Sequence, residues 1–237
     1  MNVFVVIPAS GKGKRSGTET PKQYLKFHGK ELIVYTLEVF QKNNLVDEII
    51  ISAEKEYFPL LNEIKRKFNL TKISMIVEGG EERQDSVYNA LKAIKTEGAS
   101  SDDYARLNDD LILVHDAARP LLPDNILTKA INTAKEKGNA LVCLKARDTL
   151  LKGDQLVSEY IDRSEMYYVQ TPQIFKYGDL MKAMKKAYEK NFIGTDESML
   201  IKELGIDINI VEGSMLNFKV TTTTDIEMFE KLIAPNQ

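Results

Sequence analysis

Residues 2–25, NVFVVIPASGKGKRSGTETPKQYL, are the most informative stretch of the chain. The run from Val3 to Ile7 is apolar and rich in β-branched side chains, as in a strand buried on both faces of a parallel sheet. A loop with three glycines and three cations follows, and Lys22 comes shortly after it. Glycines let backbone N–H groups wrap an anion, and fixed cations beside them neutralise a polyphosphate. This stretch therefore predicts a nucleoside-triphosphate site at the end of the first strand.

Apolar strand patterns and helical patterns alternate along most of the chain. Further strands are predicted at 48–53, 72–77, 110–114, 139–146, 208–211 and 216–221. Helices are predicted at 31–43, 83–95, 123–137, 177–190 and 195–204, with a last helix that opens on a capping-box pattern from Thr224 to Glu227. This alternation predicts an α/β, Rossmann-like fold, with a mostly parallel central sheet and helices on both faces.

Residues 146–170 break the alternation. Short strand patterns surround a turn at residues 152–154, which predicts a β-arm that projects from the main sheet. Apolar side chains such as Leu151 and Tyr160 have little local core to bury them. We expect residues 1–237 to form a single domain, from which the arm projects with apolar side chains that nothing local covers.

Composition narrows the class of protein. The 237 residues are 43% hydrophobic, which suffices for a sizeable core, and the net charge of -3 argues against a general nucleic-acid binder. Cys143 is the only cysteine, so no intrachain disulfide can form and a reducing compartment is expected. We expect that thiol to be buried and inert. The chain has no apolar run long enough for a bilayer and starts directly with a strand pattern, so the expected location is the cytoplasm.

The glycine loop matches neither of the two best-known phosphate-binding motifs. It lacks the Walker spacing, and its Gly11-x-Gly13-x-x pattern ends on Ser16 instead of glycine. A solvated basic turn is the simpler alternative. Arg15 and Lys22 favour a phosphate site, where they would stabilise charge on a transferring phosphoryl group and on a leaving pyrophosphate.

The segment VHDAARP, residues 114–120, carries the most notable carboxylate. Asp116 follows a strand and could hold Mg²⁺ against phosphate oxygens, while Ala117 and Ala118 leave room for a sugar or a base. Asp116 could equally cap a turn with Arg119 as its ion-pair partner. His115 has no nucleophile marked out nearby, so we interpret it as structural.

A second glycine pair occurs in EGGEERQDS, residues 78–86. Its backbone amides, with Ser86, could bond the edge of a base, although strand-to-helix turns often contain glycine. Spacing alone assigns no role to the hydroxyls and cations of the arm and the C-terminal third, which are Thr149, Arg163, Thr171, Thr195 and Lys219.

Taken together, these segments resemble the 2-C-methyl-D-erythritol 4-phosphate cytidylyltransferase family. The matching pieces are PASGKGKRSG, PKQYL, GGEERQDSV, VHDAARP, RDT, DR followed by QTPQIF, TDES and VEGSMLNFKVTT, in the family's order from about residue 3 to 232. The resemblance implies an α/β nucleotidyltransferase fold and a Mg²⁺-dependent enzyme of non-mevalonate isoprenoid biosynthesis. Such an enzyme transfers CMP from CTP to 2-C-methyl-D-erythritol 4-phosphate and releases pyrophosphate. It also implies a homodimer whose arms embrace.

The resemblance implies a role for each matching position. Catalysis would rest on Arg15, Lys22, Asp116 and Lys219, with Asp116 also orienting the metal. The nucleotide would be bound by Pro8, Ala9, Ser10, Gly11, Gly13, Gly80, Glu81, Ser86, Ala117 and Ala118. The polyol phosphate would be bound by Thr171, Thr195 and Lys219, and by Thr149 and Arg163 from the partner's arm.

Three other functions remain open at this point. A ribitol-5-phosphate cytidylyltransferase shares the fold and most motifs, although the alanine pair after Asp116 favours the methylerythritol enzyme. A non-catalytic nucleotide sensor would keep the glycine loop but need not keep Arg15, Lys22, Asp116 and Lys219 together. The loop spacing disfavours an NAD-binding module.

Overall fold

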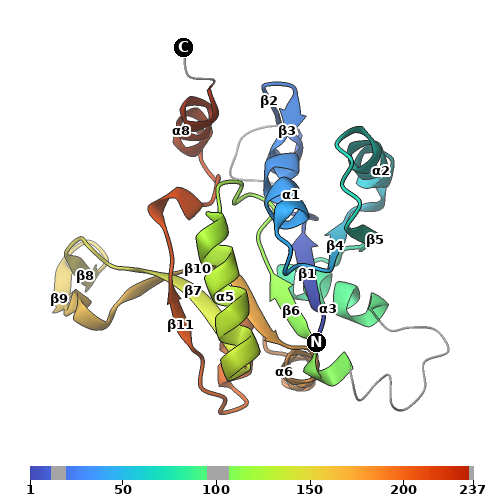
Figure 1. The fold of residues 1–237 in the computed structure, drawn as a ribbon. Coiled ribbons are helices and arrows are strands. Elements are labelled where there is room, and N and C mark those ends of the chain that lie inside the picture. Colours follow the sequence, from blue (N-terminus) through green and yellow to red (C-terminus); the bar gives the residue numbers. More distant parts are fainter. Residues whose placement is uncertain (12–19, 95–106, 235–237) are drawn as a thin grey trace.

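A seven-stranded sheet forms the centre of the computed structural model, which describes residues 1–11, 20–94 and 107–234 (Figure 1). The strand order is β11-β7-β10-β6-β1-β4-β5. Only β10 runs antiparallel to its neighbours in this sheet, so the prediction of a mostly parallel sheet is confirmed. The bounds are β1 Val3–Pro8, β4 Glu48–Ala53, β5 Ile73–Glu78, β6 Leu111–Val114, β7 Asn139–Lys145, β10 Tyr167–Lys176 and β11 Ile210–Glu212.

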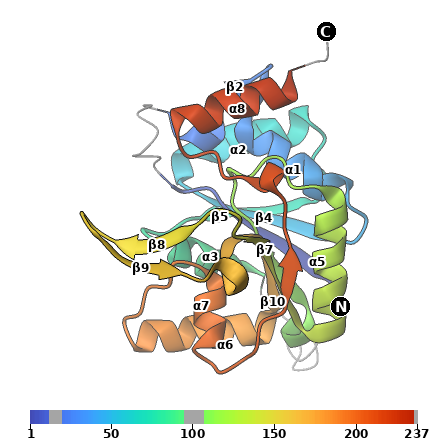
Figure 2. The ribbon, with the colours of Figure 1, turned by 90° about the vertical axis from the view of Figure 1, so that its left-hand side faces the viewer.

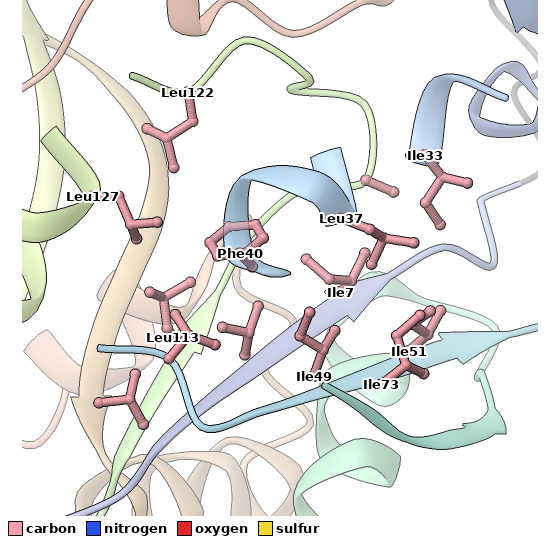
Figure 3. Close-up of a cluster of buried hydrophobic side chains, with 14 of the residues drawn as sticks. Ile7, Ile33, Leu37, Phe40, Ile49, Ile51, Ile73, Leu113, Leu122 and Leu127 are labelled. Atoms are coloured by element: carbon pink, nitrogen blue, oxygen red, sulfur yellow. The ribbon is translucent and has the colours of Figure 1, made fainter. Parts of the chain in front are cut away.

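Helices cover both faces of the sheet, as predicted. Side chains of β1 alternate between the two faces: Val5 and Ile7 enter one apolar cluster, and Phe4 and Val6 enter the other. The first cluster packs under α1 (Leu32–Lys42), α2 (Phe58–Lys67) and α5 (Asp124–Lys137). The second packs against α3 (Arg83–Ala93), α6 (Tyr177–Glu189) and α7 (Glu197–Lys202). Figure 3 shows Leu37 and Phe40 of α1 lying over the isoleucines of β1 and β4.

Two details of the predicted pattern are wrong. Residues 216–221 form no strand, because a 3₁₀ turn, η4 (Met215–Asn217), starts this segment and the rest has no regular structure. The last helix, α8 (Thr223–Ile233), is capped by Thr222 rather than Thr224. Thr222 has an extended backbone, and it exchanges hydrogen bonds with Asp225. Asp225 therefore takes the capping-box position that was predicted for Glu227.

The arm is a hairpin of its own. Strands β8 (Leu150–Gly153) and β9 (Val157–Ile161) pair antiparallel and stand away from the main sheet in Figure 1. The turn η3 (Arg163–Glu165) leads back into β10. Leu156 is 85% exposed and Tyr160 is 71% exposed, so the hairpin has almost no core within one chain.

Short elements connect the larger ones, and Phe27 of one of them packs against Phe229 of α8. The short elements are η1 (Lys22–Tyr24), β2 (Lys26–Phe27), β3 (Lys30–Glu31) and η2 (Lys55–Tyr57). Cys143 is buried in β7, and burial raises the pKa of its thiol to about 11, which confirms the expectation of an inert thiol. Within the described ranges, no helix combines the length and the apolar character that crossing a membrane requires.

Candidate functional site

The first turn of α3 joins two loops that leave the carboxyl ends of parallel strands. Ser86 of α3 contacts Ser10, just after β1, with 2.6 Å between the two hydroxyl oxygens. Arg83, at the start of the same helix, donates from Nε to Asp116 Oδ1, just after β6, at 3.1 Å. Because the carboxyl ends of parallel strands meet at one edge, this is where such sheets bind ligands. The site therefore has two parts on either side of α3.

A cavity of about 820 Å³ forms the first part. Ser10, Gly11, Gly79, Gly80 and Glu81 line it, together with Glu54, Lys55, Glu56 and Glu78. The four glutamates make this cavity unsuitable for phosphate groups. Carboxylates do accept hydrogen bonds from the amino group of cytosine, so the lining suits a base. We call this the glycine cavity.

Glycine is required at two positions of this cavity. A Cβ added to Gly79 would lie 2.5 Å from Cβ of Ser10, and one added to Gly80 would lie 2.1 Å from Cβ of Asp85. Ser86 accepts a hydrogen bond from the Gly80 amide at 3.1 Å, which ties the turn to the helix. The two glycines therefore let β5 turn tightly against the end of β1.

Gln23 anchors the described ends of the glycine loop. Its side-chain amide donates to the carbonyl oxygens of Ala9, at 2.7 Å, and of Gly11, at 3.0 Å, and the residue is buried. Lys22 precedes it in η1. Gly13 and Arg15 lie outside the described residues, so their predicted roles stay predictions.

The second part of the site is a buried carboxylate surrounded by cations. Oδ2 of Asp116 accepts from Nε of Arg119 at 3.2 Å and lies 3.0 Å from Nζ of Lys219. Oδ1 accepts from Arg83, whose Nη1 also donates to both carboxylate oxygens of Glu197, at 2.6 and 2.9 Å. We call Asp116, Arg83, Arg119, Lys219 and Glu197 the charge network. Its three cations and two carboxylates leave one positive charge in excess.

Burial and charge act against each other in this network. Burial raises the pKa of Asp116, but the charges of Arg83, Lys219 and Arg119 outweigh it and hold that pKa well below its usual range. Burial lowers the pKa of Arg83, but Glu197 and Asp116 outweigh it and raise that pKa, so the guanidinium keeps its charge. Burial also raises the pKa of Glu197, although Arg83 opposes this shift.

His115 is buried next to the charge network and contacts Arg119 and Thr171. Its Nε2 is 3.1 Å from the carbonyl oxygen of Arg119, and its Nδ1 is 3.1 Å from Oγ1 of Thr171. Burial lowers the pKa of His115 to about 4, so the ring is neutral. A carbonyl can only accept, so Nε2 carries the proton and Nδ1 accepts from the Thr171 hydroxyl. That hydroxyl in turn accepts from the Asp116 amide at 3.1 Å. His115 is structural, as interpreted from the sequence.

The segment after η4 brings Lys219 to the network. Asn217 is fully buried, and its side-chain amide donates to the Thr171 carbonyl at 2.7 Å. The carbonyl of Asn217 accepts from Nη1 of Arg119 at 2.7 Å. The Val220 amide donates to the carbonyl of Ala118 at 2.8 Å. Hydrogen bonds on both sides of Lys219 therefore hold its backbone against the loop after β6.

The structure brings together only some of the predicted site residues. Asp116, Lys219 and Thr171 are joined directly, and Ser10, Ser86 and Gly80 are joined in the glycine cavity. The alanine pair is buried, and the Ala117 carbonyl accepts from Thr36 at 2.9 Å. Pro8 ends β1, and Glu81 is exposed on the wall of the glycine cavity.

Three predicted substrate-binding residues lie apart from the network's contacts. Thr195 is exposed, and its hydroxyl donates to the sulfur of Met199 at 2.9 Å. Thr149 and Arg163 are exposed at the base of the arm, where Arg163 donates to the carbonyl of Arg147. Their roles depend on ligands or a second subunit and stay predictions.

The sequence interpretation missed Arg83 and Glu197. Both stand inside matched motifs, Arg83 in GGEERQDSV and Glu197 in TDES, so the signal was present. The first motif was interpreted as binding the base, and the second as binding the polyol phosphate. The pairing of two residues 114 positions apart could not be inferred from either motif alone.

The surroundings of Asp116 do not fit a resident metal ion. Three cationic side chains occupy its two oxygens, and they would repel a divalent cation. Over residues 1–11, 20–94 and 107–234, no group of three or more histidine, cysteine or carboxylate side chains is placed to hold a metal. Asp116 serves instead as the counter-ion that gathers the cations, which is close to the alternative of a turn-capping carboxylate paired with Arg119.

Comparison with known proteins decides the family. A sequence model of the family described as 2-C-methyl-D-erythritol 4-phosphate cytidylyltransferase matches residues 3–234. The chain belongs to this family. It is 38% identical to the enzyme of that name from Geobacter metallireducens over 235 residues, covering 98% of each chain. It is 36% identical to the one from Clostridioides difficile, covering 97% of this chain and 92% of the relative.

Solved structures of family members share the fold. The Francisella tularensis 2-C-methyl-D-erythritol 4-phosphate cytidylyltransferase superposes with a TM-score of 0.80 at 31% identity, over 98% of this chain and all of that one. The Thermus thermophilus family member gives a TM-score of 0.77 at 28% identity, and the match covers 98% of each chain. The fold is that of the family's nucleotidyltransferases, and the chain is an enzyme of this class.

Proposed function

We propose that this chain transfers CMP from CTP to 2-C-methyl-D-erythritol 4-phosphate and releases pyrophosphate, in non-mevalonate isoprenoid biosynthesis. Family membership from residue 3 to 234 carries the proposal. The names of the relatives favour the methylerythritol enzyme over a ribitol-5-phosphate cytidylyltransferase. The charge network, with its excess positive charge beside the loop after β6, suits anionic substrates, and the names of the relatives favour an enzyme over a nucleotide sensor.

The proposed chemistry is an in-line displacement at phosphorus. An oxygen of the polyol phosphate attacks the α-phosphorus of CTP, the new P–O bond forms, and the bond to the β-phosphate oxygen breaks. The nucleophile is already anionic, so no covalent enzyme intermediate is needed. Catalysis then consists of holding two anions together and neutralising the charge that develops.

The two parts of the site divide this work in the proposal. The glycine cavity takes the base, with Glu81 and the amides of Gly79 and Gly80 on its wall. The cationic loop after Gly11, with Arg15 and Lys22, takes the triphosphate and the departing pyrophosphate. Lys219 takes the phosphate of the polyol, and Asp116 holds Lys219 in place. The Thr171 hydroxyl donates its proton to His115 and accepts from the Asp116 amide. In the proposal, Thr171 therefore holds the backbone of Asp116 and does not donate to a ligand.

A requirement for Mg²⁺ remains part of the proposal, as a property of the CTP–metal substrate complex. Triphosphates bind Mg²⁺ through their own oxygens and keep several of its waters. The residues around Asp116 do not suit a metal of their own, so we route no step through one.

We propose that the enzyme works as a homodimer in the cytoplasm. The arm exposes Leu151, Leu156, Val157 and Tyr160, and Tyr168 and Val169 continue this apolar surface into β10. A second copy could cover this surface and bring Thr149 and Arg163 to the neighbouring site. Light scattering should give twice the chain mass of 26.8 kDa, and a fully active monomer would contradict the cross-subunit roles.

A pyrophosphate-release assay tests the proposed function. The four nucleoside triphosphates are each combined with 2-C-methyl-D-erythritol 4-phosphate and with ribitol 5-phosphate, with and without Mg²⁺. We expect rapid release only from CTP with the methylerythritol substrate and Mg²⁺. Faster release with ribitol 5-phosphate would identify a ribitol-5-phosphate cytidylyltransferase. If no combination released pyrophosphate, the non-catalytic nucleotide sensor would be the remaining interpretation.

A further inference from the structure

Glu197 is a buried acid at the start of α7 to which the proposed function assigns no role. Its side chain is 1% exposed. Both of its carboxylate oxygens accept from Nη1 of Arg83. The neighbouring Asp196 caps α7 by accepting from the Met199 amide, and it also accepts from the Gln173 side chain at 3.1 Å. Glu197 therefore has a fixed position relative to the sheet.

Arg83 is shared between two carboxylates from distant parts of the chain. Nη1 points to Glu197 on α7, and Nε points to Asp116 after β6. A guanidinium can also pair with one carboxylate through two parallel hydrogen bonds, which is its strongest single geometry. By holding Nη1, Glu197 fixes the orientation of the guanidinium, and in that orientation Nε alone donates to Asp116. Oδ2 of Asp116 is thus left to Arg119 and Lys219.

We propose that Glu197 is a positioning residue of the transfer reaction, which acts through Arg83 to keep Asp116 turned toward Lys219. The inference rests on the proposed function, in which Lys219 receives the phosphate of the polyol. Without the hydrogen bonds to Glu197, the guanidinium of Arg83 turns toward Asp116, pairs with it through two hydrogen bonds and displaces Lys219. The charge network then keeps all three cations, but Lys219 is no longer held beside Asp116.

This role predicts the opposite sign from simple electrostatics. Neutralising Glu197 adds one net positive charge to the network, which by itself strengthens the binding of an anion. Displacement of Lys219 from Asp116, in contrast, weakens the binding of the anionic polyol phosphate. A purely structural role would lower thermal stability and leave the Michaelis constants of the remaining folded enzyme unchanged.

Glu197→Gln is the first test, because glutamine keeps the shape and removes the charge. We expect KM for 2-C-methyl-D-erythritol 4-phosphate to rise at least about tenfold and kcat to fall, while KM for CTP stays within about twofold. Glu203→Gln is the matched control, because Glu203 ends the same helix and pairs with Lys190 in an exposed salt bridge. An unchanged or lower KM for the polyol phosphate in Glu197→Gln overturns the proposal.

A double variant covers the case in which Glu197→Gln does not fold. Arg83→Met with Glu197→Met removes both charges of the pair, and such replacements leave no unpaired buried ion. We expect it to fold and to raise KM for the polyol phosphate by less than about threefold, because no guanidinium remains that could displace Lys219 from Asp116. A rise of about tenfold or more in the double variant would mean that Glu197 does not act through Arg83, and it overturns the proposal.

Binding of inorganic phosphate, measured by calorimetry, separates this inference from the proposed function. If the wild type releases no pyrophosphate, the proposed function fails, and phosphate binding still tests Glu197. At least about tenfold weaker binding in Glu197→Gln than in wild type and Glu203→Gln supports the positioning role. Equal or tighter binding overturns it.

Discussion

The glycine cavity and the charge network lie on either side of α3 and are built in different ways. Backbone, small side chains and glutamates at the ends of β1, β4 and β5 shape the cavity, which is open and has an acidic wall. Long charged side chains from four separate segments form the network, which surrounds a buried carboxylate. Figure 2 shows how these segments converge: α3 and α7 lie on one side of the sheet, and the segment before α8 crosses its edge.

The two parts of the site are therefore sensitive to different kinds of substitution. The cavity depends on the absence of side-chain atoms, so added volume should damage it. The network depends on balanced charge in a buried place, so removal of one ion should damage it more. The predictions below test that ranking.

Asp116→Asn should have the largest effect. It leaves Arg83, Arg119 and Lys219 without their shared counter-ion. We expect the free energy of unfolding to fall by about 3–5 kcal/mol and kcat/KM to fall by at least about 10³. Urea denaturation and steady-state kinetics measure the two effects. Asp109→Asn is the control, because Asp109 pairs with Lys176 at the surface and its side chain is 66% exposed. Wild-type stability in Asp116→Asn would show that the network is not cooperative.

Arg15→Ala and Lys22→Ala come next. Each should lower kcat by about 10²–10³, because in the proposed function each contributes one cation to the triphosphate. The fold should survive, which circular dichroism can check. Lys26→Ala, which removes an exposed lysine close by in sequence, should keep wild-type turnover. Near-wild-type kcat in either active-site variant would remove that residue from the mechanism.

His115 should make the network side of the molecule acid-sensitive. Its pKa falls from 6.5 to about 4 on folding, so the unfolded chain takes up the proton first as pH drops below 6.5. The stability that the neutral ring provides is complete above pH 6.5 and is lost progressively toward pH 4, by about 3 kcal/mol. Urea melts at several pH values should show a flatter acid profile for His115→Gln. Parallel profiles would contradict the neutral buried ring.

Gly79→Ala should have the smallest effect of the four on the whole molecule. The added Cβ meets Cβ and Oγ of Ser10 at 2.5 and 2.6 Å, and relief of such a contact costs about 1–3 kcal/mol. We expect KM for CTP to rise while KM for the polyol phosphate changes little. Gly11→Ala is the matched control for stability, because an added Cβ there has no described atom within 4 Å. Equal melting temperatures for the two variants would mean that the turn adapts without strain.

Prediction from sequence succeeded where a pattern is local. The strand pattern of Val3 to Ile7 and the helical pattern from residue 83 onward were found because each repeats over a few residues. The extended run at 216–221 was wrongly predicted as a strand, because Asn217 bonds to β10 only through its side chain and the Val220 amide bonds to the loop after β6. The motif around Asp116 was found, but a metal ligand could not be told from a counter-ion without the positions of its three cations.

The alternation of strands and helices, the family, and the roles proposed for Asp116, Arg15, Lys22 and Lys219 could all be inferred from the sequence. These follow from short-range spacing and from ordered motifs, which need no coordinates. Only the tertiary structure decided what Asp116 does, because its charge is balanced by side chains that lie 33 and 3 positions away and by Lys219 far along the chain. Coulomb interactions act through space, so their partners depend on how the fold brings the segments together.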